Sequence, residues 1–396
     1  MPEPALVRQH GRWIVAAAPA ERVEGRDCLA TLNRPVLANR AADAMADGWI
    51  GLFSYDAATF IERLPDPLPD PGGPPIATLA RYPAVFAVND DGTWSIEAVS
   101  PRATARLLDG VDPSASWPTP PPGLSGPMPT SSLSPSEHRR AVDEAREFIR
   151  AGDCYQVNLA MRLTAAWSRG GPALASGIWD AAGPAAYRAY LALPDGVLIS
   201  ASPERLVRTE PGATGPSAVS GPIKGTALPG KYEELQRSTK NRAEHVMIVD
   251  LIRNDLGRVS VPGGVSVPRL TYRLSTDYAE HMVSDVRAEL RPGVSAGEIL
   301  TALLPGGSVT GCPKIRSMEI IRSLEPVSRG PAFGSVVAVG RDGSLDANIL
   351  IRTAWLRNEV ARYWCGGAVV WDSDPDEEHA EAWLKAFPFL KAIGAA

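Results

Sequence analysis

The sequence predicts an α+β fold with large antiparallel sheets, and three observations support this prediction. Strand-like segments predominate, and helical segments occur between them without the regular alternation of a βαβ repeat. The chain has 396 residues, of which 44% are hydrophobic and 21% charged, so it can bury one large core or two smaller ones. No window approaches the roughly 18 apolar residues that span a bilayer.

Charge and cysteine content exclude several classes of protein. The formal net charge is -5, and no basic cluster is interleaved with aromatic residues, which disfavours a nucleic-acid partner. The 4 cysteines lie far apart without a CxxC pair, which argues against a zinc site and a dense disulfide framework. We therefore expect a protein of the reducing cytoplasm.

A segment rich in proline, serine and glycine at residues 112–135 predicts a linker, because it can hold neither a helix nor a central strand. It divides the chain into a β-rich N-terminal region, residues 1–111, and a second region, residues 136–396, that carries the candidate site. In the first region we expect strands at 13–20, within 48–65 and within 80–100, broken by turns of the DDG type.

A helix is expected directly after the linker. It follows Ser136, its apolar positions Val142, Ala145 and Ile149 recur at helical spacing, and Gly152 ends it.

Further strands are expected after this helix. In the first of them Gln156 and Asn158 point to the opposite face from Val157, since side chains alternate along a strand. The expected strands are residues 153–163, 196–202, 335–340, 347–355 and 363–371.

One carboxylate stands at the head of an apolar helix. Residues 238–259 predict a helix that is apolar on nearly all sides between Val246 and Ile252, so it should be buried, yet Glu244 lies near its start. A buried carboxylate must be paired, protonated or bound to a metal. Taken alone, Glu244 also fits an N-terminal residue favoured by the helix dipole.

A second acidic helix is expected after an N-cap and first-turn proline at residues 374–375. Glu378 and Glu381 are three residues apart and share a face, with Lys385 one turn beyond. One interpretation is a solvated ion pair between Glu381 and Lys385. The other joins Glu378, Glu381 and Glu244 in an all-oxygen site suited to Mg²⁺.

Several other polar residues occur in unusual surroundings. Arg352 lies among isoleucine and leucine in a predicted strand, and its planar fork suits a substrate carboxylate. Glu204 lies at a strand end, as either a surface glutamate or, where burial raises its pKa, a general acid. Lys224 lies in the constrained turn SGPIKGTALPG, as either a surface amine or an amine held against a substrate. Glycine-rich turns at 304–314 and 365–370 can present backbone N–H groups to an anion.

Eight segments, taken in order, resemble one family. They are GDCYQVNLAMRL, SASPERLV, PIKGT, KNRAEHVMIVDLIRNDLGRV, AEHMVSDV, LPGGSVTGCPKIRSMEII, DANILIRTAW and GGAVVWDSDPDEEHAEAWLKA. The family comprises the chorismate-utilising enzymes, which include anthranilate, aminodeoxychorismate, isochorismate and salicylate synthases. The resemblance covers roughly residues 135 to 392, and GWIGLFSYD matches more faintly. It implies the fold of anthranilate synthase component I, with large antiparallel sheets flanking the site and helices outside.

The resemblance also implies roles for particular residues. It makes Glu244, Glu378 and Glu381 the ligands of Mg²⁺, which binds one carboxylate of chorismate, and it places His281 near the substrate ring. Substrate-binding roles are implied for Gly225, Thr226, Ser308, Arg352, Gly366, Gly367 and Lys385.

Lys224 distinguishes between branches of the family. Aminodeoxychorismate synthases carry this lysine, whereas anthranilate and isochorismate synthases usually have alanine there. The implied reaction converts chorismate and ammonia to 4-amino-4-deoxychorismate, the precursor of 4-aminobenzoate, with Lys224 as covalent nucleophile and Glu204 as general acid. Gln156 stands where isochorismate and salicylate synthases use a lysine to activate water, which disfavours addition of water.

The resemblance further implies a partner, because related enzymes take ammonia from a glutamine amidotransferase subunit and no such cysteine nucleophile motif occurs here. Two alternatives are an anthranilate or amino-deoxyisochorismate synthase component I, which aminates C2, and an inactive regulatory or scaffolding subunit. The inactive subunit is supported by two departures from the family pattern. Ala332 replaces an aromatic residue, unless Phe333 fills its space, and Ala368 replaces the third glycine of a turn.

Overall fold

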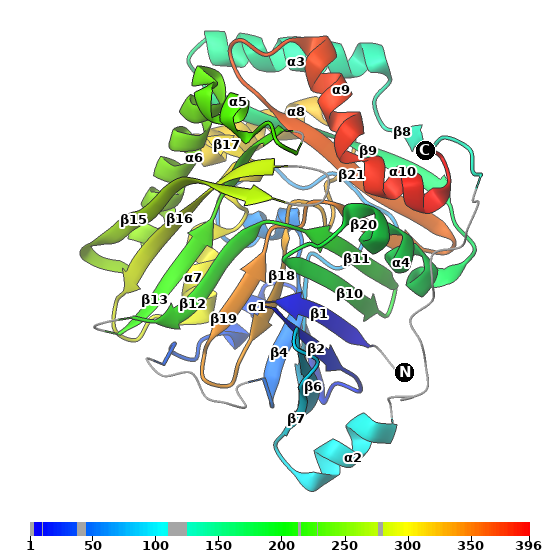
Figure 1. Ribbon diagram of the computed structural model, residues 1–396, viewed down its shortest axis with the longest axis vertical. Coiled ribbons are helices and arrows are strands. Elements are labelled where there is room, and N and C mark those ends of the chain that lie inside the picture. The colour runs from blue at the N-terminus through cyan, green and yellow to red at the C-terminus, as the bar shows by residue number, and fades with distance from the viewer. Residues whose placement is uncertain are drawn as a thin grey trace.

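The structure, a computed structural model, describes residues 4–9, 11–37, 45–109, 125–212, 215–227, 229–275 and 280–396. These residues form two large antiparallel sheets with helices packed around them, which confirms the predicted α+β class (Figure 1). None of the described helices is both long enough and apolar enough to span a membrane.

The first sheet has 11 strands, and β9 and β21 form its most extensive pair. In spatial order it contains β17 (Gly311–Cys312), β9 (Gln156–Ala166), β21 (Val360–Val369), β20 (Thr353–Arg357), β11 (Gly196–Ser202), β10 (Tyr187–Leu193), β1 (Ala5–Gln9), β2 (Arg12–Ala16), β6 (Ala84–Asn89) and β7 (Trp94–Ala98), with β8 (Thr130–Ser131) beside β9.

The second sheet has 10 strands and supplies the other side of the candidate site. In spatial order it contains β14 (Ile223–Ala227), β16 (Glu280–Leu290), β13 (Pro216–Gly221), β12 (Arg205–Pro211), β19 (Leu345–Asn348), β18 (Ser335–Val339), β4 (Gly48–Phe53), β5 (Ala77–Tyr82) and β3 (Glu21–Glu24), with β15 (Ser260–Ser275) beside β16.

The helices cover the sheets and their ends. They are α1 (Asp27–Thr31), α2 (Pro101–Asp109), α3 (Pro135–Arg150), α4 (Gly170–Ala182), α5 (Tyr232–Arg237), α6 (Thr239–Gly257), α7 (Ala296–Leu303), α8 (Lys314–Leu324), α9 (Pro375–Lys385) and α10 (Phe387–Ile393), with the 3-10 helices η1 (Tyr55–Phe60) and η2 (Gly307–Val309). Figure 1 shows α9 and α10 following β21, with α9 beside α3 and α10 packed against α4.

Each sheet combines strands from both sides of the predicted linker. Strands β1, β2, β6 and β7 extend the first sheet, and β3, β4 and β5 extend the second. Residues 110–124, most of that linker, lie outside the described residues. The division at residues 112–135 therefore stays a prediction, and it does not separate one sheet from the other.

Two hydrophobic cores stabilise this arrangement. The larger core joins residues of both sheets to helices α6 and α7, and includes Val7, Leu52 and Leu300. The smaller core lies between the first sheet and helices α4 and α10, where Tyr363 stacks on Phe389 with ring centroids 4.9 Å apart.

Helix ends agree closely with the capping residues in the sequence. Helix α3 begins two residues earlier than predicted, because Ser134 is the N-cap and forms a capping box with Glu137, with Pro135 as the first helical residue. In α9 the side chain of Asp374 accepts from the backbone N–H groups of Asp376 and Glu377, as the sequence predicted.

Two expectations are corrected. Helix α6 is only partly buried, since Val246 is 51% exposed and Asp250 also faces solvent. The single strand predicted at 347–355 is two strands, β19 and β20, in different sheets. The chain breaks between them, and Arg352 adopts a positive φ of 52° in that break.

Candidate functional site

The candidate site lies where the edge of the second sheet meets the first. Strand β14 carries Lys224, and strand β9 of the first sheet carries Gln156. The Lys224 amine donates a hydrogen bond of 3.4 Å to Oε1 of Gln156, whose side chain is fully buried. Among the described residues its buried amide nitrogen Nε2 has no hydrogen-bond partner, so one donor of the site is left unsatisfied.

Glu204 faces the same region from the end of β11. It is 3% exposed, and burial raises the pKa of its carboxyl to about 7. The neighbouring Ser308 hydroxyl and the charge of Lys224 oppose this rise. The backbone N–H of Ile223, next to Lys224, donates to Oε1 of Glu204 at 3.5 Å. A carboxyl with this pKa can hold or release a proton near neutral pH.

The amine of Lys224 is itself shifted toward its neutral form. Burial lowers its pKa, and the positive charge of Lys385 acts in the same direction. The carboxylates of Glu244, Glu204 and Glu381 oppose this shift, with Glu244 exerting the largest of the three effects. Lys224 therefore stands within electrostatic reach of residues from β11, α6 and α9, and it is no ordinary surface lysine.

The acidic face of α9 rests on a glycine of β21. A Cβ placed on Gly367 would lie 3.0 Å from Oε2 of Glu378 and 3.8 Å from both Oε1 of Glu381 and Nζ of Lys385. The ammonium of Lys385 donates to the carbonyl oxygen of Gly366 at 3.0 Å and pairs with Glu381 at 2.6 Å. The predicted ion pair is thus confirmed, and it lies beside the predicted metal ligands.

The donor chemistry of this region fits Mg²⁺, because it consists of carboxylate oxygens. Glu378 and Glu381 lie side by side over Gly367, and Ser373 donates to Oε1 of Glu378 at 2.7 Å. Among the described residues, however, no three acidic, histidine or cysteine side chains gather closely enough to hold a metal together. Glu378 and Glu381 lie together on α9, and a shared Mg²⁺ site with Glu244 stays a prediction.

His281 lies on β16 beside β14, where the register pairs it with Thr226. Its Nδ1–H donates to the carbonyl oxygen of Gly225 at 3.2 Å, and burial lowers the pKa of the ring. Gly225 has a φ of +71°, and a Cβ there would lie 2.6 Å from Leu235, so glycine is required. His281 is neutral and oriented by the turn that carries Lys224.

Arg352 follows Ile351 in the break between the two sheets. Its carbonyl accepts from the backbone N–H of Ala201 on β11, and burial lowers the pKa of its guanidinium. The predicted residue is therefore held near the end of the strand that leads to Glu204.

Two polar residues of this region were not predicted as site residues. Asn158 is 7% exposed on β9, and its Oδ1 has no hydrogen-bond partner in the part of the chain that the structure describes. His245 follows Glu244, and its Nε2 lies 2.6 Å from Oγ of Ser284. The signal for Asn158 was available, since an asparagine two residues after Gln156 in an apolar strand must face the same side.

The two departures from the family pattern have different surroundings. Ala332 is buried, and the next residue, Phe333, has a φ of +63° and places its ring over the guanidinium of Arg329. Ala368 pairs with Asn158 across β21 and β9. Phe333 is thus a buried ring in the region where the family aromatic is absent.

Comparisons with known proteins agree on one family. A family model described as chorismate binding enzyme matches residues 7–391. Anthranilate synthase component 1 of Thermus thermophilus is 36% identical over 403 residues, covering 94% of this chain and 84% of that protein. Aminodeoxychorismate synthase component 1 of Escherichia coli is 34% identical over 371 residues, covering 87% and 77%.

Solved structures show the same fold. Anthranilate synthase component I from Streptococcus pneumoniae matches with a TM-score of 0.83 and 26% identity, over 95% of this chain and 91% of that one. The menaquinone-specific isochorismate synthase from Escherichia coli matches with a TM-score of 0.76 and 18% identity, over 99% and 88%. These matches confirm the predicted anthranilate synthase component I-like fold.

Proposed function

The chain belongs to the family of chorismate-binding enzymes, and from this premise we propose that it is component I of an aminodeoxychorismate synthase. It would convert chorismate and ammonia to 4-amino-4-deoxychorismate. The observation that carries this proposal is Lys224, whose pKa is lowered by burial and whose neighbour Glu204 has a pKa raised to about 7. These shifts favour the neutral amine and the protonated carboxyl, and nucleophilic displacement of a hydroxyl requires both forms.

The first step would be attack by Lys224. Its Nζ forms a bond to C2 of chorismate, the two ring double bonds shift from C1=C2 and C5=C6 to C1=C6 and C4=C5, and the bond from C4 to its hydroxyl breaks. Glu204 gives its proton to that hydroxyl, which leaves as water. The lysine nitrogen then passes one proton to the Glu204 carboxylate and becomes a neutral secondary amine.

The second step would return the lysine. Ammonia forms a bond to C4, both double bonds shift back, and the bond between C2 and Nζ breaks as the lysine nitrogen takes a proton from the Glu204 carboxyl. The new C4 ammonium loses a proton to the Glu204 carboxylate, which restores the acid. The sum is chorismate plus ammonia giving 4-amino-4-deoxychorismate plus water.

The remaining site residues would bind and orient chorismate. Arg352 and Lys385 supply positive charge for its carboxylates, and the glycine turns allow close approach. Glu378, Glu381 and Glu244 would hold Mg²⁺, which supplies positive charge for one substrate carboxylate when bound. Ammonia would come from a separate glutamine amidotransferase subunit.

The competing reaction is amination at C2 to give anthranilate, because anthranilate synthases are about as similar to the chain as aminodeoxychorismate synthases. The decisive experiment incubates the purified chain with chorismate, Mg²⁺ and ammonium at alkaline pH, then adds an aminodeoxychorismate lyase. We expect 4-aminobenzoate. Anthranilate as the product would overturn the C4 assignment, and unchanged chorismate would indicate the inactive subunit.

A further inference from the structure

A buried ion pair between Arg329 and Glu325 links β9 to the turn at 306–309. Arg329, in the loop after α8, is 2% exposed, and Glu325 directly follows that helix. The guanidinium donates to Glu325 twice, from Nε to Oε2 at 2.9 Å and from Nη2 to Oε1 at 2.6 Å. This fork-to-fork geometry is the strongest form of an arginine–carboxylate contact.

The same pair grips backbone groups of the site. Nη1 of Arg329 donates to the carbonyl of Val309 at 2.8 Å, and Nη2 donates to the carbonyl of Asn158 at 2.7 Å. Oε1 of Glu325 accepts from the backbone N–H of Ala160 at 2.8 Å. Val309 follows Ser308, the neighbour of Glu204, and Asn158 lies two residues after Gln156, the partner of Lys224.

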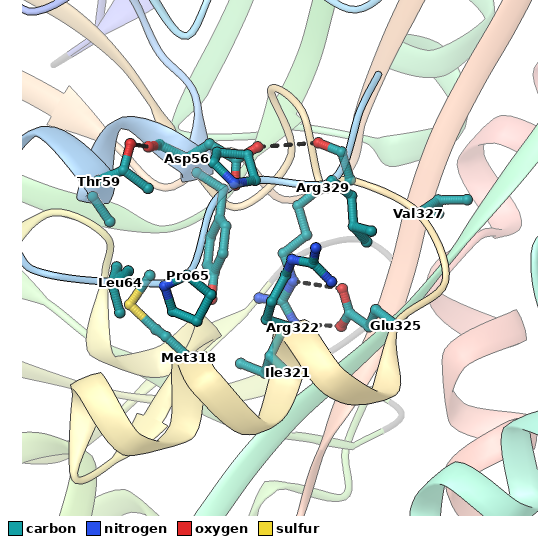
Figure 2. Close-up of a pocket in the computed structure, with 15 residues that line it drawn as sticks. Asp56, Thr59, Leu64, Pro65, Met318, Ile321, Arg322, Glu325, Val327 and Arg329 are labelled. Carbon is teal, nitrogen blue, oxygen red and sulfur yellow. Dashed lines mark hydrogen bonds and ion pairs between the residues drawn. The ribbon is translucent and has the colours of Figure 1, made fainter. Parts of the chain in front are cut away.

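Two aromatic rings, those of Tyr55 and Phe333, pack on the guanidinium of Arg329. Its central carbon lies 4.5 Å from the ring centroid of Tyr55 and 4.6 Å from that of Phe333. Figure 2 shows Arg329 and Glu325 facing each other at the inner end of the pocket between η1 and α8. Within the described part of the chain, no hydrogen bond or ion pair joins either partner to the side chain of Lys224 or Glu204, so a role in the site must act through the backbone.

We propose that Arg329 and Glu325 are positioning residues, which set β9 and the turn at 306–309 so that Gln156 and Ser308 meet Lys224 and Glu204. This inference rests on the proposed function for the roles of those four residues. The bonds from one guanidinium to a carbonyl of η2 and a carbonyl of β9 fix the separation of these two segments. No apolar pair of similar size can do this, because only directional bonds fix such a geometry.

Loss of this geometry should lower the rate of the reaction. A displacement of about 1 Å in a reacting group costs roughly 10²-fold in rate. If the turn moves, the Ser308 hydroxyl leaves Glu204, and the pKa of Glu204 rises because one interaction that opposes burial is lost. The charged groups facing Glu204 from the other elements, Lys224 and Lys385, are unchanged.

The sharpest test replaces both partners at once. Removing one partner leaves an uncompensated buried charge, whereas replacing a buried pair with apolar residues of similar volume is often neutral for stability. We expect the double variant Arg329→Met/Glu325→Leu to fold but to melt at a lower temperature than the unmodified chain, because three buried backbone groups lose their partners. Its kcat/KM for chorismate consumption should fall about 10²-fold. Retention of full kcat/KM in this folded variant would overturn the proposal.

A matched control lies at the other end of the same sheet. Glu97 on β7 is also buried, accepts from Arg12 and accepts from the backbone N–H of Met45 at 3.0 Å. Strand β7 is the edge farthest in order from β9. The variant Arg12→Met/Glu97→Leu should retain kcat/KM within about threefold. A loss equal to that of the Arg329/Glu325 variant would show a general stability effect and overturn the proposal.

A second variant keeps the test decisive if the double variant does not fold. Arg329→Lys keeps the charge but cannot bond Glu325, Val309 and Asn158 together. We expect kcat/KM to fall about tenfold. We also expect the limb of the pH–rate profile that reports Glu204 to move to higher pH. Glu204→Gln identifies this limb, because the limb is absent from the profile of that variant. A purely structural role would reduce the amount of active enzyme and leave that limb in place, and this result would overturn the proposal.

Failure of the proposed function is distinguishable from failure of this inference. Product identity tests the function, whereas the rate of chorismate loss tests the Arg329/Glu325 pair whichever carbon is aminated. If the unmodified chain consumed no chorismate, the proposed function would be wrong. The affinity for chorismate, measured by calorimetry, would then test the Arg329/Glu325 pair in place of the rate. Affinity weakened about tenfold in the variants would then support the inference, and unchanged affinity would overturn it.

Discussion

The amine of Lys224 and the amide oxygen of Gln156 lie 3.4 Å apart, and their hydrogen bond joins the two sheets of the molecule. Lys224 belongs to the edge strand β14 of one sheet and Gln156 to β9 of the other. The amide of Gln156 is neutral, so it holds the amine in place. A carboxylate at this position would instead favour the ammonium form. The placement of the proposed nucleophile therefore depends on how the sheets meet.

Replacement of Lys224 by alanine should abolish the covalent route. We expect ammonia-dependent product formation to fall by about 10³-fold or more, because no other described amine is assigned to that step. Intact-protein mass spectrometry with chorismate should show an adduct in the unmodified chain that is absent in Lys224→Ala. The control is Lys231→Ala, an exposed lysine seven residues later that pairs with Glu234. Full activity in Lys224→Ala would exclude the covalent route.

The variant Gln156→Glu should move the pH dependence of the same step. A carboxylate at this position stabilises the ammonium form, so the pKa of Lys224 rises and less neutral amine is present at a given pH. The limb of the pH–rate profile that reports Lys224 should move upward by about one to three pH units. The measurement is kcat/KM for chorismate across pH 6 to 10. If this limb stays at the same pH, the ionisation of the Lys224 amine does not control kcat/KM.

Substitution of Gly367 tests the proposed Mg²⁺ site. A methyl group there would lie 3.0 Å from Oε2 of Glu378, so the carboxylates of α9 must shift. We expect Gly367→Ala to weaken Mg²⁺ binding about 10- to 100-fold, as loss of support around metal ligands commonly does. Isothermal titration with Mg²⁺ measures this without reference to activity. Gly257→Ala is the control, because a Cβ there meets nothing within 4 Å. Equal Mg²⁺ affinity in both variants would place the metal elsewhere.

Local sequence patterns predicted most of the elements that build the site. The N-cap Asp374 and the alternation around Gln156 are encoded within a few residues, so α9 and β9 could be placed from the sequence alone. The break before Arg352 could not, because an apolar run such as ANILIRTAW fits one strand as well as two strands in different sheets. Only tertiary packing decides between them.

The environment of the candidate site was predictable only through the resemblance. Nothing within the segment around Glu204 shows that Ser308, about a hundred residues later, lies next to it. The Arg329–Glu325 pair left no signal either, since an i,i+4 arginine and glutamate is usual on exposed surfaces. Its importance comes from burial and from the three backbone groups that it contacts.

The raised pKa of Glu204 makes a prediction about stability. Its pKa is about 7 in the folded chain against 4.5 for the ordinary side chain, so the folded state binds a proton that the unfolded state releases between these values. The free energy of unfolding should therefore decrease as pH rises from about 4.5 to 7, by on the order of 3 kcal/mol from this residue alone.

Glu204→Gln removes this dependence, because glutamine is neutral at every pH. The difference in unfolding free energy between Glu204→Gln and the unmodified chain should move in favour of the variant as pH rises through this window, and then stay constant above pH 8. Urea unfolding at pH 5 and pH 8 measures both chains, and the comparison cancels titrations that they share. A difference that is the same at both pH values would mean that Glu204 is already ionised at pH 5, and it would remove this residue as the general acid.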